Sequence, residues 1–144
     1  VDVGAEVTNI AKEFSGLAAS RRATVVVDAT ATPPVSMRPD ALRHIVLNLL
    51  DNAVKYGPPG QTVRVTVRPS DEGVMIAVDD EGPGIPVADR ERIWRPFTRG
   101  STAVSNGGSG IGLTIVREVA SANGGSTRVE ASPSGGARFV VNLK

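Results

Sequence analysis

The chain reads Gly107-Gly108-Ser109-Gly110-Ile111-Gly112 directly before an apolar helical pattern, so four glycines fall within six residues. Glycine loses more backbone freedom on folding than any other residue, and a run this rich in it needs a structural reason. One such reason is a backbone that approaches an anion closely, with free N–H groups at a helix start that bind it. A flexible linker into a helix is the alternative, and this stretch alone leaves both open.

The bulk composition narrows the classes of protein to consider. A chain of 144 residues is long enough for a sizeable core, and we expect residues 1–144 to form a single domain. The formal net charge of +1 does not indicate nucleic acid or an anionic membrane as the main partner. There is no cysteine, which excludes disulfides and thiolate metal sites. No apolar run approaches the ~18 residues of a membrane span. Because the first residue is Val rather than Met, we expect a fragment of a longer protein.

The hydrophobic periodicity predicts an α+β fold, a two-layer α/β sandwich with a mixed sheet of about five strands covered on one face by about three helices. The predicted helices span residues 3–22, 40–56 and 111–122, and the last should bury Ile111, Ile115, Val119 and Ala122. The predicted strands lie near residues 24–28, 63–68, 74–79, 127–131 and 137–143. Residues 85–109 have no strong period beyond a short helical turn near 87–94, and a connection this long is either functional or misassigned.

A polar stripe runs along the helix expected at 40–56. Asn48, Asn52 and Lys55 stand at i, i+4 and i+7, which places them within about 60° of one another around the helix. Asn52 borders the apolar arc, so its amide should be partly buried and should find hydrogen-bond partners. Two amide oxygens and an ammonium group suit a hydrated Mg²⁺ that carries phosphate oxygens. A polar flank with a surface lysine four residues after Asp51 is the alternative.

A second polar feature follows the strand expected at 74–79, where the chain reads Asp79-Asp80-Glu81-Gly82-Pro83-Gly84-Ile85. Strand parity places Asp80 on the face that should be buried. An unpaired carboxylate there is costly, so Asp80 needs a donor. The amino group of a purine ring would serve, and Gly82 and Gly84 would let a flat ring lie against the backbone. An acidic β-turn at a strand end is the alternative.

These segments occur in one order, and the whole resembles the catalytic ATP-binding (HATPase_c, Bergerat-fold) domain of bacterial two-component sensor histidine kinases. The resemblance covers essentially the whole chain, and four ordered boxes make it specific. The N, G1, F and G2 boxes match, in turn, Asn48-Leu49-Leu50-Asp51-Asn52-Ala53-Val54-Lys55-Tyr56, Asp80-Glu81-Gly82-Pro83-Gly84-Ile85, Trp94-Arg95-Pro96-Phe97-Thr98-Arg99 and Gly108-Ser109-Gly110-Ile111-Gly112-Leu113.

The resemblance implies that the chain binds ATP and Mg²⁺ and assigns the polar stripe to the triphosphate. Asn52 would ligate the metal, with Asn48 beside it near the ion and the phosphates. Lys55 would reach the phosphates, and Tyr56 would pack along the nucleotide. Arg99 would approach the γ-phosphate. The residues expected to take part in catalysis are therefore Asn48, Asn52, Lys55 and Arg99.

The same resemblance assigns the base and a lid. Asp80 would accept a hydrogen bond from the adenine amino group, in a pocket shaped by Gly82, Gly84 and Ile85. Phe97 would anchor a flexible ATP lid at about 96–110, although an ordinary core role is as plausible for that residue. The glycine-rich loop would bind the nucleotide through Gly108, Ser109, Gly110, Ile111, Gly112 and Leu113, with the backbone N–H groups of Gly110, Gly112 and Leu113 directed at the phosphates. Arg90 and Arg92 are expected to form a solvated face rather than a phosphate cluster.

Three positions depart from the family's usual residues without removing an expected ligand. Glu81 stands where an asparagine is common, and Asn123 replaces a frequent histidine. Thr98 stands where an aromatic residue is common, which leaves the packing of the lid open.

Asn48 separates a kinase from related ATPases. Relatives that hydrolyse ATP or phosphorylate serine commonly carry a glutamate one helical turn before the metal-binding asparagine, where it acts as general base. Asn48 cannot accept a proton there, whereas a neutral imidazole already carries a free lone pair. This favours phosphoryl transfer to histidine, with catalysis supplied by positioning and charge neutralisation. The alternatives are a non-catalytic nucleotide-sensing or protein-interaction module of the same fold and a hydrolytic ATPase.

The acceptor histidine is expected to lie outside this chain. The single histidine, His44, is followed by Ile45-Val46 rather than by an acidic residue, and we expect an ordinary helix residue there. By resemblance, the partner is a histidine-bearing helical dimerisation domain of the parent kinase and, indirectly, a response regulator. The fragment should be a cytoplasmic monomer that binds ATP with little turnover, while its parent should be a membrane-anchored homodimer.

Overall fold

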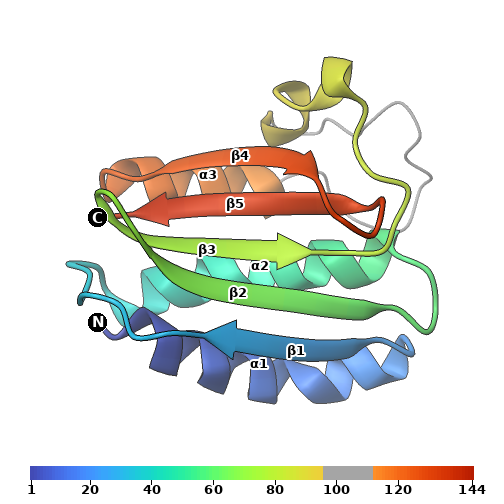
Figure 1. Cartoon of the computed structure of the whole chain (residues 1–144), viewed down its shortest axis with the longest axis horizontal. Helices are drawn as coiled ribbons and strands as arrows, with labels where there is room; N and C mark the ends of the chain where they lie inside the picture. Colours follow the sequence, from blue (N-terminus) through green and yellow to red (C-terminus); the bar gives the residue numbers. More distant parts are fainter. Residues whose placement is uncertain (96–111) are drawn as a thin grey trace.

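The computed structural model describes residues 1–95 and 112–144. Its elements, in chain order, are α1 (Val3–Ser20), β1 (Thr24–Ala29), α2 (Pro39–Tyr56), β2 (Thr62–Ser70), β3 (Gly73–Asp79), the 3₁₀ turns η1 (Val87–Asp89) and η2 (Arg92–Trp94), α3 (Gly112–Ala122), β4 (Ser126–Ala131) and β5 (Ala137–Leu143). Figure 1 shows the two layers that these elements form. The predicted α+β sandwich is therefore confirmed.

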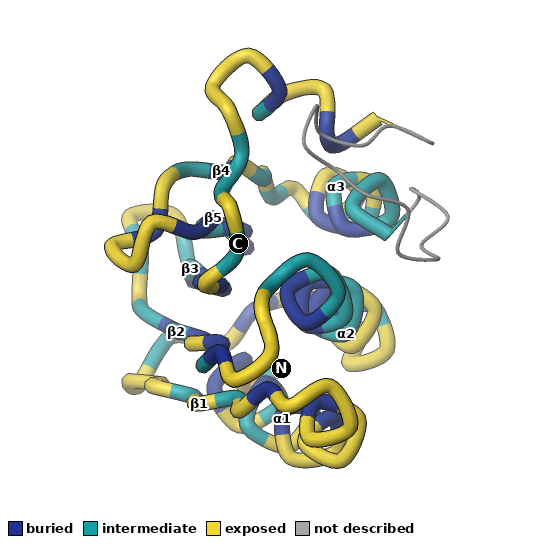
Figure 2. Tube along the Cα trace, turned by 90° about the vertical axis from the view of Figure 1, so that its right-hand side faces the viewer, coloured by how far each residue is buried: buried dark blue, intermediate teal, exposed yellow. Residues whose placement is uncertain are grey.

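The sheet has the strand order β1-β2-β3-β5-β4, with β1 parallel to β2 and the other neighbours antiparallel. It is the mixed five-stranded sheet that the sequence predicts. The three α-helices of the described segments lie on one face of this sheet (Figure 2), and no described element covers the other face. Residues near the strand ends therefore point either to the face covered by the helices or to the uncovered face.

Alternate side chains of β2 and β3, which form an antiparallel hairpin, point into the core. Val65 on β2 and Ile76 on β3 are fully buried, as are their neighbours two residues away on either side. Leu49 of α2 is likewise fully buried within the same core cluster. Each such side chain contributes about 1.5–3 kcal/mol through burial. The residues between them, such as exposed Arg64, point to the open face.

Local sequence sets the bounds of the first two helices. Asp2 caps α1, since its Oδ1 accepts a hydrogen bond from the backbone N–H of Ala5 at 3.2 Å. Pro39 occupies the first turn of α2, where its missing N–H removes no helical hydrogen bond. Gly57 follows the last residue of α2 and donates to the carbonyl of Ala53 at 3.1 Å.

The buried side of α3 differs from the prediction. The structure buries Val116 and Ala120, while Ile115 and Val119 are only half-buried and Ala122 is exposed. Successive helix positions are 100° apart, so the core-facing stripe lies one position further along than predicted. Both stripes are apolar in the sequence, and the small Ala120 suits close packing. The remaining predicted residue of that stripe, Ile111, lies outside the described residues.

None of the helices within 1–95 and 112–144 combines the length and the apolar character needed to cross a membrane.

Candidate nucleotide-binding site

Asp80 directly follows β3 and is only 4% exposed, as strand parity predicts. Its Oδ1 accepts hydrogen bonds from the backbone N–H groups of Gly82 and Ala137, each at 3.0 Å. Its Oδ2 accepts no hydrogen bond from any residue that the structure describes. The described residues thus donate to one carboxylate oxygen of Asp80 and not to the other.

The electrostatics of Asp80 follow from this arrangement. Burial raises the pKa of the carboxyl above its usual value because it disfavours the charged form. The hydrogen bonds from Ala137 and Gly82 act in the opposite direction, and the adjacent charge of Asp79 raises the pKa further. The net pKa is raised, so the ionised form gains from any further donor that reaches Oδ2.

Glycines around Asp80 permit close backbone packing. A Cβ at Gly82 would lie 2.8 Å from the carbonyl oxygen of Tyr56, the last residue of α2. A Cβ at Gly136 would overlap the backbone carbonyl of Asp80. Gly84 has φ of +76°, which favours glycine. The role predicted for Gly82 and Gly84, room for a flat ring, stays a prediction, because the contacts in the structure are with α2 and with the turn before β5.

The predicted polar stripe lies on α2 beside the start of α3. Asn48 donates from Nδ2 to the carbonyl of His44 at 2.7 Å, and its Oδ1 would lie 3.1 Å from a Cβ at Gly112. The N-box helix and the first residue of α3 are therefore in direct proximity. Asn52 is half-buried, as predicted, but its amide makes no hydrogen bond with a described residue, so the expected partners are not seen. His44 is exposed.

Lys55 is half-buried and makes the contact named as the alternative. Its Nζ lies 2.8 Å from Oδ2 of Asp51, one helical turn earlier. This ion pair holds the ammonium group on the same side of α2 as the asparagines. Tyr56, the next residue, is also half-buried.

The remaining predicted site residues fall into two groups. Ile85 and Leu113 are half-buried and pack against the core cluster, with Gly112 at the first position of α3. Six predicted residues lie outside the described residues, namely Phe97, Arg99, Gly108, Ser109, Gly110 and Ile111.

Two arginines of the preceding connection have structural contacts. Arg90 is half-buried and donates from Nε to the carbonyl of Ile85 at 3.1 Å, so it does more than form a solvated face. Arg92 is exposed, as predicted, and forms an ion pair with the buried Asp89.

A clamp of side chains joins η2 to α3. Thr114 donates from Oγ1 to the carbonyl of Trp94 at 2.9 Å. The guanidinium of Arg117 lies over the Trp94 ring, 5.1 Å from its centroid, and pairs with Glu91. This pairing lowers the pKa of Glu91. The ring of Phe139 also contacts Trp94, edge-on, with 6.0 Å between the two centroids. No pattern in the sequence indicates these contacts, which hold Trp94 and the first turns of α3 close together.

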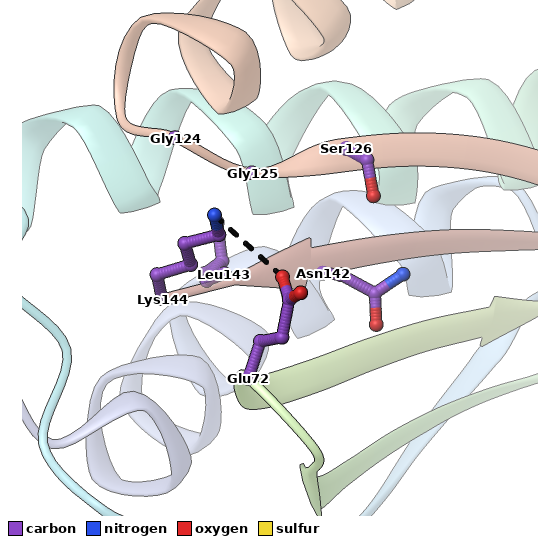
Figure 3. A pocket seen from close by; sticks show the side chains of 7 residues that line it. All are labelled: Glu72, Gly124, Gly125, Ser126, Asn142, Leu143 and Lys144. Carbon is purple, nitrogen blue, oxygen red and sulfur yellow. Dashed lines mark ion pairs between the residues drawn. The ribbon is translucent and has the colours of Figure 1, made fainter.

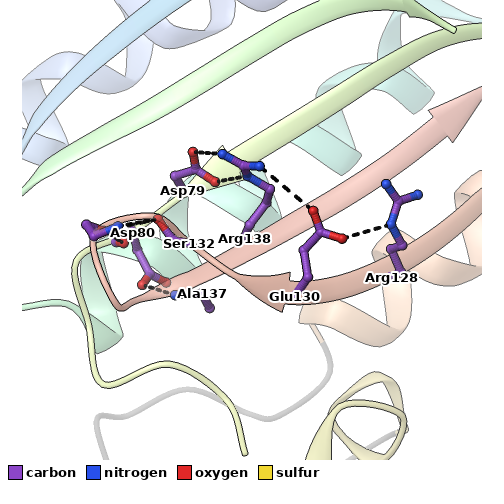
Figure 4. A network of polar contacts seen from close by, with 8 residues as sticks. Asp79, Asp80, Arg128, Glu130, Ser132, Ala137 and Arg138 are labelled. Atoms are coloured by element: carbon purple, nitrogen blue, oxygen red, sulfur yellow. Dashed lines mark hydrogen bonds and ion pairs between the residues drawn. The ribbon is translucent and has the colours of Figure 1, made fainter. Parts of the chain in front are cut away.

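Asp79, the residue before Asp80, lies on the open face of the sheet and pairs with charged side chains. Asp79 receives two hydrogen bonds from Arg138, at 2.6 and 3.0 Å (Figure 4). Arg138 also lies 3.9 Å from Glu130, which pairs with Arg128 at 3.2 Å. This network extends from β3 across β5 to β4. It was not predicted, because the sequence does not reveal the register that brings Asp79 opposite Arg138.

A small cavity of about 220 Å³ (Figure 3) lies next to Glu72, just before β3, whereas Asp80 follows the end of that strand. It contains none of the predicted site residues. Its lining is formed by Glu72, Gly124, Gly125, Ser126, Asn142, Leu143 and Lys144, with Lys144 and Glu72 paired at 3.6 Å.

Gln61, which the sequence analysis did not single out, connects the two parts of the site. Its side chain donates from Nε2 to the carbonyl of Ala53 at 2.9 Å, next to Asn52 on α2. Its Oε1 accepts from the backbone N–H of Glu81 at 3.1 Å, next to Asp80. The predicted metal-binding helix and the predicted adenine loop are therefore adjacent.

The chain belongs to the family of histidine kinase-, DNA gyrase B- and HSP90-like ATPases (HATPase_c), whose model matches residues 37–144. The sensor-type histidine kinase PrrB of Mycobacterium tuberculosis is 46% identical over 106 residues, which are 73% of this chain and 23% of that protein. The signal transduction histidine-protein kinase/phosphatase MprB of Mycobacterium avium is 44% identical over 119 residues, 81% of this chain and 23% of that protein. The chain thus spans about a quarter of the length of these relatives.

Solved structures of the same kind are also similar. The mycobacterial sensor histidine kinase MprB matches with a TM-score of 0.89 and 32% identity, over 99% of this chain and 95% of that one. The ATP-binding domain of PrrB from Mycobacterium tuberculosis matches with a TM-score of 0.79 and 29% identity, over 99% and 93% of the two chains. The resemblance to the ATP-binding catalytic domain of sensor histidine kinases, inferred from the sequence, is confirmed.

Proposed function

We propose that this chain binds ATP with Mg²⁺ and transfers the γ-phosphoryl group to a histidine on a separate helical dimerisation domain. The observation that carries the proposal is the junction at Gln61, because it sets the helix with Asn48 and Asn52 beside the loop with Asp80. A single nucleotide needs both, one for its phosphates and one for its base. Members of the family are described as ATPases and histidine kinases, which agrees with this assignment.

The residues present fit an adenine nucleotide. Asp80 offers one carboxylate oxygen that no described residue uses, which suits the amino group of adenine. Asn52 and Asn48 offer amide oxygens, hard ligands of the kind that Mg²⁺ accepts. The bound metal would neutralise charge on the phosphates. Lys55, held on the same stripe by Asp51, would add a positive charge near them.

A histidine acceptor follows from the chemistry of Asn48. This side chain donates to the carbonyl of His44 and has no basic group with which to deprotonate water or a hydroxyl. A neutral imidazole needs no such help. His44 itself is an exposed residue in the first half of α2, so the acceptor is proposed to belong to the dimerisation domain of the parent kinase. A homodimeric, membrane-anchored parent and a response regulator complete the proposal.

The proposal is tested first by binding. Titration with a non-hydrolysable ATP analogue should give strong Mg²⁺ dependence in the original protein and a weaker dependence in Asn52→Ala. Asn123→Ala is the matched control, because it makes the same substitution just after α3, where the Asn123 amide donates to the carbonyl of Val119 at 2.8 Å. Equal Mg²⁺ dependence in all three proteins would contradict the metal role of Asn52.

Transfer is tested next. The chain is mixed with the histidine-bearing segment of its parent and γ-labelled ATP, and acid-labile label should appear on that segment. The chain alone should release little phosphate. Tight nucleotide binding without transfer would indicate a non-catalytic nucleotide-sensing module, and steady phosphate release by the chain alone would indicate a hydrolytic ATPase.

A further inference from the structure

Gln61 is a buried polar side chain whose amide nitrogen and amide oxygen each make a hydrogen bond. It lies in the short connection between α2 and β2 and is 2% exposed. Buried amides are normally hydrogen-bonded, and both ends of this one bind backbone groups rather than other side chains. A Cβ at position 57 would overlap this amide, so the glycine there makes room for the Gln61 side chain. Gln61 is thus a fitted component of the junction between two elements.

At one end, Gln61 helps to fix a single peptide group. The N–H of Glu81 donates to Oε1 of Gln61 at 3.1 Å, and the carbonyl of Asp80, in the same peptide plane, accepts from Oγ of Ser134 at 3.1 Å. The N–H groups before and after it are also engaged, that of Asp80 with the carbonyl of Ala137 and that of Gly82 with Oδ1 of Asp80. Rotation of this peptide would turn the Asp80 carboxylate, so Gln61 and Ser134 together set its direction.

At its other end, Gln61 binds the last turn of α2. The carbonyl of Ala53 accepts from Nε2 at 2.9 Å and also from the N–H of Gly57 at 3.1 Å. This carbonyl thus keeps its helical partner four residues later, and Gln61 supplies a second donor to it. Ala53 directly follows Asn52. One side chain therefore spans from the peptide beside Asn52 to the peptide beside Asp80.

We propose that Gln61 is a positioning residue for nucleotide binding, which holds the Asp80 carboxylate in register with the asparagines of α2 so that base and phosphates are bound together. The inference rests on the proposed function. Its physical basis is that removing the amide leaves the Glu81 N–H and one acceptor site of the Ala53 carbonyl unpaired, and the loop relieves this by shifting. A shift of the loop misplaces Oδ2 of Asp80.

The test compares Gln61→Met, which keeps the length of the side chain but has no amide, with Val7→Ala, a core change in α1 that lowers stability away from the site. Binding is measured for non-hydrolysable ATP and ITP analogues, since hypoxanthine lacks the amino group that Asp80 would accept. Gln61→Met should weaken ATP-analogue binding about tenfold and ITP-analogue binding much less. Val7→Ala should bind both nucleotides as the original protein does while it remains folded.

Ser134→Ala keeps the inference testable if Gln61→Met does not fold, because Ser134 is exposed and holds the same peptide from the other side. Ser134→Ala should also reduce the ratio of ATP-analogue to ITP-analogue affinity, by a smaller factor than Gln61→Met. In an Asp80→Asn background, Gln61→Met should cost little further ATP affinity.

Suppose that the original protein binds the ATP analogue more tightly than the ITP analogue. If Gln61→Met keeps this preference, whether its affinities are unchanged or both equally reduced, the role of Gln61 is refuted while that of Asp80 stands. An original protein that binds both analogues equally would instead refute the role proposed for Asp80, and the inference with it.

Discussion

Asp79 and Asp80 are neighbours in the chain and lie on opposite faces of the sheet. Asp79 faces the open side and is neutralised by the bidentate contact with Arg138. Asp80 faces the buried side, where backbone N–H groups satisfy one of its oxygens and burial raises its pKa. A carboxylate with a matched cation is complete within the protein. Asp80 is buried, and no described residue donates to its second oxygen, which is why we propose that Asp80 binds a ligand while Asp79 has a structural role.

The largest expected effect is a loss of nucleotide affinity when Asp80, the buried acid of the pair, is replaced. In Asp80→Asn, the amide oxygen can still accept from Gly82 and Ala137, which leaves the NH₂ group facing the adenine amino group, donor against donor. Affinity for a non-hydrolysable ATP analogue should fall about 100-fold, the usual cost of a lost charged hydrogen bond. Isothermal titration calorimetry measures it. Asp79→Asn is the matched control and should lose less than about fivefold; equal losses would show that the two acids are not functionally distinct.

The open side should respond in stability rather than in binding. Arg138→Met leaves the nearly buried Asp79 without its bidentate partner and should lower the free energy of unfolding by about 2 kcal/mol, less than for a fully buried pair because Arg138 remains partly exposed. Urea unfolding followed by the fluorescence of Trp94 measures it. Adding Asp79→Asn to Arg138→Met should recover part of the loss. If the double variant is less stable than the single one, the charge of Asp79 is not the cause.

Asp80 should contribute a pH dependence to nucleotide binding. An adenine amino group would favour the charged carboxyl and lower its pKa in the complex, so the ligand-free protein takes up a proton at higher pH than the complex does. Affinity should therefore be full above the raised pKa and fall as the pH drops through it, by at most about tenfold per pH unit. The ratio of affinities of the original protein and Asp80→Asn, measured at each pH, cancels the nucleotide's own titration. A flat ratio would contradict the prediction.

The same raised pKa affects the stability of the ligand-free protein with the opposite sign. The ionised carboxyl of Asp80 lowers stability above its raised pKa, and this loss diminishes as the pH falls toward the ordinary range of an aspartate. Thermal unfolding across the same pH series should therefore show a smaller gain on acidification in Asp80→Asn than in the original protein.

The smallest effect concerns the outer part of the open-face network. Arg128→Ala removes an exposed ion pair with Glu130 and should change the free energy of unfolding by less than about 0.5 kcal/mol. Nucleotide affinity should not change. A loss as large as that of Arg138→Met would mean that the network acts as one unit rather than as a strong pair with a weak extension.

The strands and the burial of Asp80 could be predicted because they depend on local alternation. Val63, Val65 and Val67 fix the buried face of one strand, and parity carries the same argument along the next strand to Asp80. The stripe of Asn48, Asn52 and Lys55 follows from helix geometry in the same way. The pairing of Lys55 with Asp51 was named as an alternative for the same local reason.

The rest could not be predicted because it depends on contacts between distant segments. The donor from Ala137 to Asp80 joins residues 57 positions apart, and the link from Gln61 to Glu81 joins residues 20 apart. The prediction of the buried side of α3 was wrong because two adjacent apolar stripes, one with Ile115 and one with Val116, fit the helical period equally well. Only packing against the rest of the core chooses between them.

The hydrogen bond from Ala137 to Asp80 also has a consequence for the order of events during synthesis. Ala137 begins β5, so a chain still growing on the ribosome lacks one of the two donors to the Asp80 carboxylate until residue 137 has been made. Nascent chains that stop before β5 should fail to retain nucleotide even when α2 and the central hairpin have formed. Nucleotide capture would then mark the completion of the domain, and ligand could not stabilise a half-made chain.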